Sequence, residues 1–330
     1  MSIQETFDSF NKLNVLIIGD VMIDAYMWGN VSRISPEAPV PIVAVNKKEN
    51  RMGGAANVAL NVQAMGGNPL LCSVIGDDDG SKIFIDLLKK QKLSTEGILK
   101  SDKRNTTVKT RVIGNNHQML RVDEEIETPI NTKETESLVF VIKKLINTKK
   151  VNVIIFEDYD KGVISPVLIK SIVAFARQKN IPTVVDPKKK NFMFYSGVTL
   201  FKPNLKELKE GLKSDFDHNN SKELGKAVDG FIKKQNIETA LITLSEKGIY
   251  THSKKSKTLI PAHIRNISDV SGAGDTVVSV AALCLALHLS PVLTATLANL
   301  AGGLVCEKVG VVPIDKQQLL NEAIALKLTK

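Results

Sequence analysis

The chain contains few cysteines, and it lacks an apolar run long enough to cross a membrane. Its three cysteines, Cys72, Cys284 and Cys306, stand singly in apolar surroundings, which indicates reduced core thiols rather than a disulfide framework or a zinc site. The most apolar stretch, residues 276–289, is shorter than the roughly 20 residues that a transmembrane helix needs. The amino terminus lacks a basic region followed by an apolar one, so we expect no secretory signal and a cytoplasmic location.

Aromatic residues make up only 5% of the chain, and they form no pattern typical of RNA-binding sheets. The formal net charge is +9, but the lysines are spread along the sequence in short groups. Solvated helix faces and a site for anionic substrates account for this excess, so we expect neither nucleic acid nor a membrane as a partner. A non-catalytic protein that binds through its basic charge remains the lower-ranked alternative.

The chain also lacks an internal repeat and a linker rich in Gly, Ser or Pro, so residues 1–330 are predicted to form a single domain. Unbroken apolar runs, typical of strands buried on both faces of a parallel sheet, occur at residues 15–19, 70–76, 153–156, 183–186 and 240–243. Helical patterns occupy residues 55–65, 81–91, 132–147, 166–179, 221–235, 276–289, 291–308 and 316–328. This alternation predicts a doubly wound α/β fold with a mainly parallel sheet and helices on both sides.

Two segments interrupt that alternation. Residues 25–46 contain several prolines and the strand-like PVPIVAV, and residues 106–122 form two alternating runs around Gly114-Asn115-Asn116, which is a hairpin signal. Neither segment has a helix with which to form a crossover. Together they are predicted to form a small antiparallel β lid that projects from the main sheet.

Small residues precede the apolar helix pattern near the carboxyl terminus, in DVSGAGDT (residues 269–276). The backbone amides of Gly272, Ala273 and Gly274 can approach an anion closely, and the dipole of a helix that begins there favours negative charge. Asp275 would then accept a proton from an attacking hydroxyl group. The alternative is an ordinary helix start with Asp269 or Ser271 as the N-cap residue.

A second glycine-rich helix start lies in RMGGAANVALNVQAMGG (residues 51–67). Gly53 and Gly54 allow a ligand to meet bare backbone, and Asn57 offers both a donor and an acceptor, which suits sugar hydroxyls. A tight helix-packing site is the alternative, and for Asn61 on the next turn we favour packing.

These two stretches resemble the ribokinase-like (PfkB) family of small-molecule kinases, and so do several others along nearly the whole chain. They are GDVMID (19–24), VSRISPEAPVPIV (31–43), EDYDKG (157–162), VDPK (185–188), KPNLKE (202–207) and SEKG (245–248). The branch they resemble phosphorylates D-glycero-β-D-manno-heptose 7-phosphate at its anomeric hydroxyl. Its 1,7-bisphosphate product serves ADP-heptose synthesis for lipopolysaccharide or S-layer glycans. A ribokinase-like kinase of another sugar or sugar phosphate is the nearest alternative.

By position, the resemblance implies that Asp275 is the catalytic base and that Gly272, Ala273 and Gly274 form the anion hole. It places five residues on the sugar: Asp24, Gly53, Gly54, Asn57 and Asp158. It places five others along ATP: Asn204, Glu207, Ser245, Gly248 and Asn299. The expected cofactors are ATP and Mg²⁺, which Glu207 would hold through water, and a monovalent cation near Asp269 is an open possibility. Asn204 as a simple turn residue and Asn299 as a helix-packing group are the alternatives.

A sugar phosphate brings its own dianion, so its site should contain additional cations. The candidates are Arg111, Lys188, Arg33, Lys161, and then Lys109 and Arg121, in that order. Most of them lie in the two lid segments, and closure of the lid would exclude water from the site. Exposed apolar lid positions such as Ile42, Val43, Val112 and Ile113 would need a partner, so we expect a homodimer formed through the lid.

The chain departs from the resembled branch at Glu157, where a small residue is usual. A carboxylate close to an anionic sugar would repel it unless a cation or water intervenes, which leaves room for a different acceptor. None of the five histidines forms the H-x-G-H motif of nucleotidyltransferases, so we expect no such domain within these residues.

Overall fold

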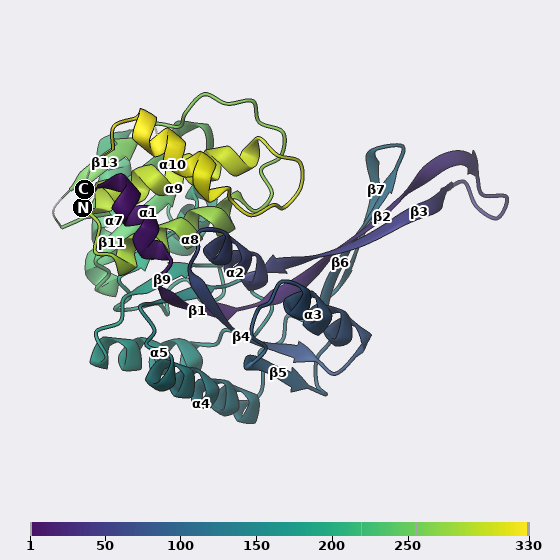
Figure 1. The fold of residues 1–330 in the computed structure, drawn as a ribbon, viewed down its shortest axis with the longest axis horizontal. Coiled ribbons are helices and arrows are strands. Elements are labelled where there is room, and N and C mark those ends of the chain that lie inside the picture. The colour runs from purple at the N-terminus through teal and green to yellow at the C-terminus, as the bar shows by residue number, and fades with distance from the viewer. Residues whose placement is uncertain (1, 219, 255, 329–330) are drawn as a thin grey trace.

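A computed structural model describes residues 2–218, 220–254 and 256–328, and within them the chain forms a large mixed sheet and a small second sheet (Figure 1). The large sheet has nine strands in the order β13-β12-β11-β10-β9-β8-β1-β4-β5. Its strands are β1 (Asn14–Gly19), β4 (Asn68–Gly76), β5 (Gly97–Ser101), β8 (Val153–Glu157), β9 (Thr183–Asp186), β10 (Leu200–Phe201), β11 (Thr239–Thr243), β12 (Ile249–Ser253) and β13 (Lys257–Ile260). The pairs from β5 to β11 are parallel, and β12 and β13 complete one edge in antiparallel orientation.

Helices cover both faces of the large sheet, because its strands are apolar on both faces (Figure 1). One face packs against α1 (Ile3–Phe10), α2 (Ala55–Ala64), α3 (Asp79–Lys90), α8 (Ala273–Ala286), α9 (Pro291–Cys306) and α10 (Lys316–Ala325). The other packs against α4 (Thr132–Thr148), α5 (Pro166–Gln178), α6 (Leu205–Leu212) and α7 (Ser221–Gln235). Local sequence sets several helix starts: Asn131 and Glu134 form a capping box at α4, and proline opens α5 and α9.

The second sheet, which we call the lid, projects from the main body (Figure 1). Its strands, in the order β3-β2-β6-β7, are β2 (Val21–Ile34), β3 (Pro41–Gly54), β6 (Thr107–Gly114) and β7 (His117–Glu124). The ends of β2 and β3 nearest the main sheet are buried, and their distal halves are largely exposed. The lid therefore has one end fixed in the core and one end in solvent.

The predicted fold class is confirmed, including the small sheet built from both interrupting segments. The expectation of a purely antiparallel lid was wrong, because β2 pairs with β6 in parallel and only the β2–β3 and β6–β7 pairs are antiparallel. The helix expected at residues 276–289 begins at Ala273, so Asp275 lies in its first turn. No helix among the described residues combines the length and the apolar character that a membrane span requires.

Candidate active site

Charged side chains gather where the central parallel strands end. Glu157 is the last residue of β8, Asp186 is the last residue of β9, and Lys202 follows β10 directly. Glu157 and Asp186 are register partners on neighbouring strands. Since ligands of open α/β sheets bind at the carboxyl ends of the strands, this edge is the candidate active site.

Asp275 is the carboxylate that the late helix α8 brings to this edge, and it is only 5% exposed. Asn57 of α2 donates a hydrogen bond to its Oδ2 at 2.7 Å, and the Tyr159 hydroxyl donates one to its Oδ1 at 2.8 Å. Burial raises the pKa of Asp275 to about 6, although these two hydrogen bonds favour the ionised form. The side chain is thus oriented by two donors and has a raised proton affinity, as a general base requires.

The three small residues before Asp275 form the start of α8. Gly272 is the N-cap residue with a φ of +80°, a conformation that side-chain-bearing residues rarely adopt. The Ala273 amide makes a long contact of 3.3 Å with the Val270 carbonyl. The backbone amides of the first helical turn are the groups that attract an anion at a helix start. The predicted anion hole and the predicted base therefore lie on one helix turn.

Asn57 and Asn61, one turn apart on α2, have different roles. Asn57 contacts Asp275, whereas Asn61 is fully buried and accepts hydrogen bonds from the Thr276 hydroxyl at 3.0 Å and the Ile314 amide at 3.0 Å. Asn61 thus joins α2, α8 and the segment before α10, which is the packing role that we favoured for it.

Glu157 lies beside Asp186 and Asp275, and the nearest oxygens of the three carboxylates are within 4.8 Å of one another. Burial, together with these two neighbouring carboxylates, raises the pKa of Glu157 well above its usual range. The Lys202 ammonium contacts Asp186 Oδ2 at 2.8 Å, and the carboxylates around it outweigh burial and raise its pKa. Sequence reasoning noticed Glu157 as an added charge but did not place it next to the base.

The predicted sugar side is built where the lid joins the main body. Asp24 of β2 is buried and accepts a hydrogen bond from Arg111 Nη1 of β6 at 2.6 Å. A Cβ atom on Gly53 would lie 2.3 Å from Asp24 Oδ2, so a larger residue here would displace that carboxylate. Gly54 is the N-cap residue of α2, just before the turn that carries Asn57. The structure therefore brings Asp24, Gly53, Gly54 and Arg111 together.

A second arginine, Arg51 of β3, lies near Arg111. The two guanidinium groups stack on the Tyr26 ring, with Cζ 5.0 Å and 5.3 Å from its centroid. Such stacking orients the planar groups while leaving donors for an anion. Sequence reasoning did not select Arg51, although it stands two residues before the glycine pair and on the same strand.

The other predicted phosphate-binding cations are less favourably placed. Lys161 forms ion pairs with Glu125 at 2.7 Å and Glu127 at 2.8 Å. Lys188 forms an ion pair with Glu207 and lies over the Tyr159 ring, 5.4 Å from its centroid. Burial alone would lower the pKa of Lys188, but the nearby carboxylates Asp186 and Glu207 raise it. Lys188 is thus close to the carboxyl edge, whereas Lys161 belongs to a charge network at the base of the lid.

Arg33 is exposed in the distal half of β2, opposite Ile42. Nine residues separate it from Asp24 along the strand, which corresponds to about 30 Å at roughly 3.3 Å per residue. The structure does not bring Arg33 together with Asp275 within one subunit.

Asp158 points into the protein rather than toward this site. Its Oδ2 accepts hydrogen bonds from Asn191 at 3.0 Å and from Tyr195 at 2.8 Å, and the residue is 1% exposed. Burial raises its pKa to about 7. These contacts favour a structural role for Asp158, and its expected contact with the sugar stays a prediction.

The predicted ATP residues form two groups. Asn204 and Glu207 make a reciprocal capping box at the start of α6, with both hydrogen bonds at 2.8 Å. Gly248, with a φ of +90°, leaves no room for a Cβ atom beside the Ile260 carbonyl, and Asn299 donates a hydrogen bond to the adjacent Pro261 carbonyl at 2.8 Å. Ser245 begins the short 3₁₀ helix (Ser245–Lys247) that precedes Gly248. The second group thus surrounds the segment after β13.

Besides Arg51, three contributors to the site were missed: Tyr159, Asp186 and Lys202. The signal for Asp186 was present, because it ends an apolar strand run as Glu157 does. Tyr159 could not be read from a pattern, since its contact with Asp275 spans 116 residues.

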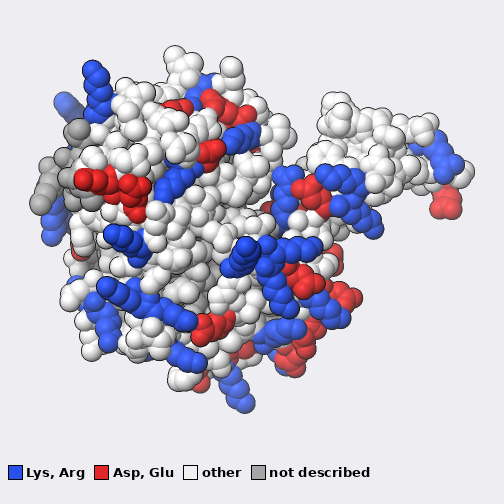
Figure 2. All heavy atoms as spheres, viewed as in Figure 1, with Lys and Arg blue, Asp and Glu red and all other residues white. Residues whose placement is uncertain are grey.

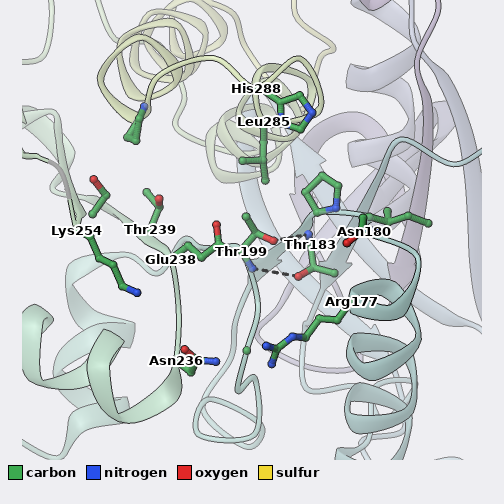
Figure 3. A pocket seen from close by; sticks show the side chains of 15 residues that line it. Arg177, Asn180, Thr183, Thr199, Asn236, Glu238, Thr239, Lys254, Leu285 and His288 are labelled. Carbon is green, nitrogen blue, oxygen red and sulfur yellow. Dashed lines mark hydrogen bonds between the residues drawn. The ribbon is translucent and has the colours of Figure 1, made fainter.

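A cavity of about 800 Å³ lies at the opposite edge of the sheet (Figure 3). It is lined by Thr183 and Thr239, the first residues of β9 and β11, and by Arg177 and His288. This cavity is at the amino ends of the strands, away from Asp275, so we do not place the reaction there.

Lys and Arg side chains are interspersed with Asp and Glu over the visible face of the main body (Figure 2). They gather more densely near the junction with the lid, while much of the lid itself is uncharged in this view. The location of the charge is consistent with an anionic small molecule at the lid base.

A buried carboxylate in the first turn of a glycine-led helix, at the carboxyl edge of a doubly wound sheet with a small β lid, defines a ribokinase-like architecture. Phosphofructokinase-2 from Escherichia coli, in complex with potassium, superposes with a TM-score of 0.78 at 15% identity over 96% of this chain and 99% of that one. Ribokinase from Arabidopsis thaliana, complexed with ribose and ATP, gives 0.70 at 14% identity over 93% and 98%. At these identities the likeness shows the fold.

The sequence pattern of the pfkB family of carbohydrate kinases matches residues 12–317, and the chain belongs to this family. It is 38% identical over 319 residues to the bifunctional protein HldE of Caulobacter sp. strain K31, covering 96% of this chain and 64% of that protein. It is 39% identical over 299 residues to HldE of Aliarcobacter butzleri strain RM4018, covering 91% and 62%. The chain thus spans somewhat less than two thirds of the length of these relatives. The resemblance to PfkB kinases is confirmed.

Proposed function

We propose that this carbohydrate kinase transfers the γ-phosphoryl group of ATP to the anomeric hydroxyl of D-glycero-β-D-manno-heptose 7-phosphate. The observation that carries the proposal is Asp275, buried and held by Asn57 and Tyr159 in the turn that presents the amides of residues 272–274. The similarity to HldE proteins over nearly the whole chain supports the choice of sugar.

The transfer is a direct in-line displacement. Asp275 accepts the proton of the anomeric hydroxyl as the sugar oxygen forms its bond to the γ-phosphorus. The bond between that phosphorus and the β–γ bridging oxygen breaks, and its electron pair leaves with ADP. The amides at the start of α8 stabilise the charge on the transferred group because they point at it without reorganising.

Mg²⁺ would supply charge neutralisation at the nucleotide phosphates, with Glu207 as its support through water. Glu207 and Asn204 fit this role as an oxygen-bearing pair at a helix start close to Lys188. A monovalent cation would lie near Asp269, whose carboxylate accepts hydrogen bonds from the Ser271 amide at 2.9 Å and the Gly310 amide at 3.0 Å. The potassium bound to the structurally similar phosphofructokinase-2 supports this second site.

The 7-phosphate of the sugar would bind Arg111, with Arg51 beside it on Tyr26. Both cations sit at the lid base, a few residues along the strands from Gly53 and Asp24, so one ligand can span the sugar side and the cation pair. Lys188 remains a candidate for binding phosphate at the carboxyl edge of the main sheet, where it pairs with Glu207. Lys161 and Arg33 rank lower for the reasons given above.

We propose a homodimer formed through the lid, and the exposed apolar side chains of the lid support it. Those more than two-fifths exposed are Ile34, Val40, Val45, Met119, Leu120 and Val122. The residues expected to drive dimerisation, Ile42, Val43, Val112 and Ile113, are instead partly or largely covered within one subunit. A partner lid would cover the exposed set.

The test is a substrate panel with coupled detection of ADP. Heptose 7-phosphate should give the highest kcat/KM, above fructose 6-phosphate and above unphosphorylated ribose and fructose. Faster turnover of an unphosphorylated sugar would refute the assignment. A preference for fructose 6-phosphate would show that the acceptor is a different sugar phosphate, while the phosphoryl transfer itself would stand.

A further inference from the structure

The segment that joins β13 to α8 (residues 261–272) runs from the predicted nucleotide residues to the predicted anion hole. The structure describes all of this β13–α8 segment and shows neither a helix nor a strand in it. Its large apolar side chains do not hold it in place, because Ile264, Ile267 and Val270 are 104%, 58% and 68% exposed. A segment with so few buried contacts is expected to open easily unless polar contacts fix it.

One arginine attaches the middle of this segment to the helices beside it. Arg265 forms a bidentate ion pair with Glu322 of α10, in which one contact measures 3.1 Å, and it contacts Glu307 at the end of α9 at 3.3 Å. The arginine side chain is only 9% exposed. In the part of the chain that the structure describes, it is the one side chain of residues 262–268 with an ion pair or a hydrogen bond. Bidentate pairs of this kind fix the orientation of both groups.

Arg265 packs directly on the backbone of α9. A Cβ atom built on Gly303 would lie 2.7 Å from Arg265 Nε, so the guanidinium group occupies the space that a side chain at this position would need. The arginine lies largely out of solvent, where the loss of hydration offsets much of its attraction to the two carboxylates. The pair is therefore better suited to fix the path of the segment than to add stability.

From Arg265 the segment leads to the anion hole. The backbone amides of Ser268 and Asp269 both donate hydrogen bonds to the Cys306 carbonyl, at 2.8 and 3.2 Å. Gly272, three residues after Asp269, is the N-cap residue of α8. The approach to the anion hole is therefore fixed at two neighbouring places, the Arg265 ion pairs and the end of α9.

We propose that Arg265 is a positioning residue for nucleotide binding, and that its pairs with Glu307 and Glu322 hold the β13–α8 segment in the arrangement that binds ATP. This inference rests on the proposed function, because it places ATP between Asn299 and the amides of residues 272–274. Without the ion pairs, ATP has to order the segment when it binds, and the entropy lost in that ordering lowers the affinity. The acceptor binds at the lid base, so its binding should change little.

The experiment is a calorimetric titration with a non-hydrolysable ATP analogue and Mg²⁺, together with steady-state kinetics on the best acceptor of the substrate panel. Arg265→Met keeps an unbranched side chain and removes the charge. It should weaken analogue binding and raise KM for ATP about tenfold or more, with smaller changes in kcat and in KM for the acceptor. Arg265→Lys keeps the charge but loses the bidentate geometry, so it should restore part of the affinity.

Glu322→Gln tests the same link from α10 and provides a second variant if Arg265→Met does not fold. It should weaken analogue binding in the same direction but less, because Glu307 still pairs with Arg265. Combined with Arg265→Met, it should cause little further loss, since the two residues act through one contact.

A thermal melt and a matched control separate a role in positioning from a role in stability. Asp315 caps α10, and its carboxylate accepts a hydrogen bond from the Gln318 amide at 3.0 Å. Asp315→Ala should lower Tm because it removes this cap. It should leave analogue binding unchanged, because the contact that it removes lies within α10.

A lower Tm of Arg265→Met with unchanged analogue affinity would overturn the proposal and leave Arg265 as a purely structural link. Analogue binding needs no sugar, so this result is independent of the substrate panel. Weakened binding by Arg265→Met, in a protein that does not phosphorylate heptose 7-phosphate, would support the positioning role and contradict the acceptor. Unchanged binding, in a protein that does phosphorylate it, would do the reverse.

Discussion

Charged side chains at the carboxyl edge of the main sheet differ from those of the lid in their burial and in their ion pairing. Every residue of β8 and β9 is buried, whereas every residue of β7 is exposed. At the sheet edge, carboxylates outnumber the cations that contact them, and two of their oxygens have no hydrogen-bond partner in the described part of the chain. In the lid, Lys109, Arg111 and Arg121 each have a carboxylate partner.

This difference indicates that the two regions have different roles, one in the phosphoryl transfer and the other in binding the acceptor. Unpaired buried charge is costly, so it persists where a ligand, a proton or an ion uses it. An ion pair that is partly exposed contributes little to stability. Its cation can therefore leave the protein carboxylate and bind the phosphate of a substrate instead. We therefore assign the reaction to the sheet edge and the choice of acceptor to the lid base.

The largest effect should come from Asp275→Asn. The amide keeps the shape of the side chain but cannot accept the proton, so kcat should fall about 10²–10⁴-fold. Steady-state kinetics measures this loss, and Asp79→Asn, an exposed carboxylate in the first turn of α3, is the matched control. A few-fold effect would remove general-base catalysis from the mechanism and favour a purely structural role for Asp275 in the first turn of α8.

Asp20→Ala should cause the largest loss of stability. The Asp20 carboxylate is buried and accepts hydrogen bonds from the backbone amides of Tyr159, Lys161 and Val163, at 2.9, 3.1 and 3.0 Å. Its removal leaves these amides unpaired, which should cost about 3 kcal/mol or more of unfolding free energy.

Urea denaturation measures that loss. Asp102→Ala, at an exposed turn, should change stability by less than about 0.5 kcal/mol. Equal stability of both variants would show that the loop carrying Tyr159 is not anchored by Asp20.

Arg111→Met tests whether the base of the lid binds the phosphate of the sugar. Loss of a charge-assisted contact with the sugar phosphate should raise KM for heptose 7-phosphate about 10- to 100-fold, with a smaller change in kcat. Arg121→Met is the control, because Arg121 lies on the exposed strand β7 and pairs with Asp123. Equal effects of the two substitutions would argue against a specific phosphate contact by Arg111.

Leu120→Gln tests the lid as a dimer surface and should have the smallest effect on chemistry. Leu120 is 57% exposed on β7, and its replacement should weaken the dimer about tenfold or more, as measured by analytical ultracentrifugation. Val167→Gln on the outer face of α5 should leave association unchanged. A wild type that stays monomeric at all concentrations would refute the proposed dimer.

The sequence was informative where burial imposes a pattern. The apolar runs of β1, β8 and β9 predicted the centre of the sheet, and Ser221–Gln235 was predicted to the residue. The strand β10, only two residues long, leaves too short a pattern to recognise. Residues 47–51 of β3 are mostly charged, because that part of the lid faces water, so their pairing could not be inferred.

Individual residues of the site could be predicted from the sequence, but the contacts between them could not. Glycine-led helix starts marked Asn57 and Asp275 separately, and their hydrogen bond across 218 residues is a product of the tertiary fold. The cluster around Glu157 depends on strand order, since β8 and β9 are neighbours and α8 begins above them. Local sequence does not encode that adjacency.

The most direct test is a crystal structure with a non-hydrolysable ATP analogue and heptose 7-phosphate bound together. The account predicts that the γ-phosphate lies at the amides of residues 272–274 and that the anomeric hydroxyl faces the Asp275 carboxylate. A γ-phosphate bound elsewhere, or a sugar whose anomeric carbon points away from Asp275, would contradict it.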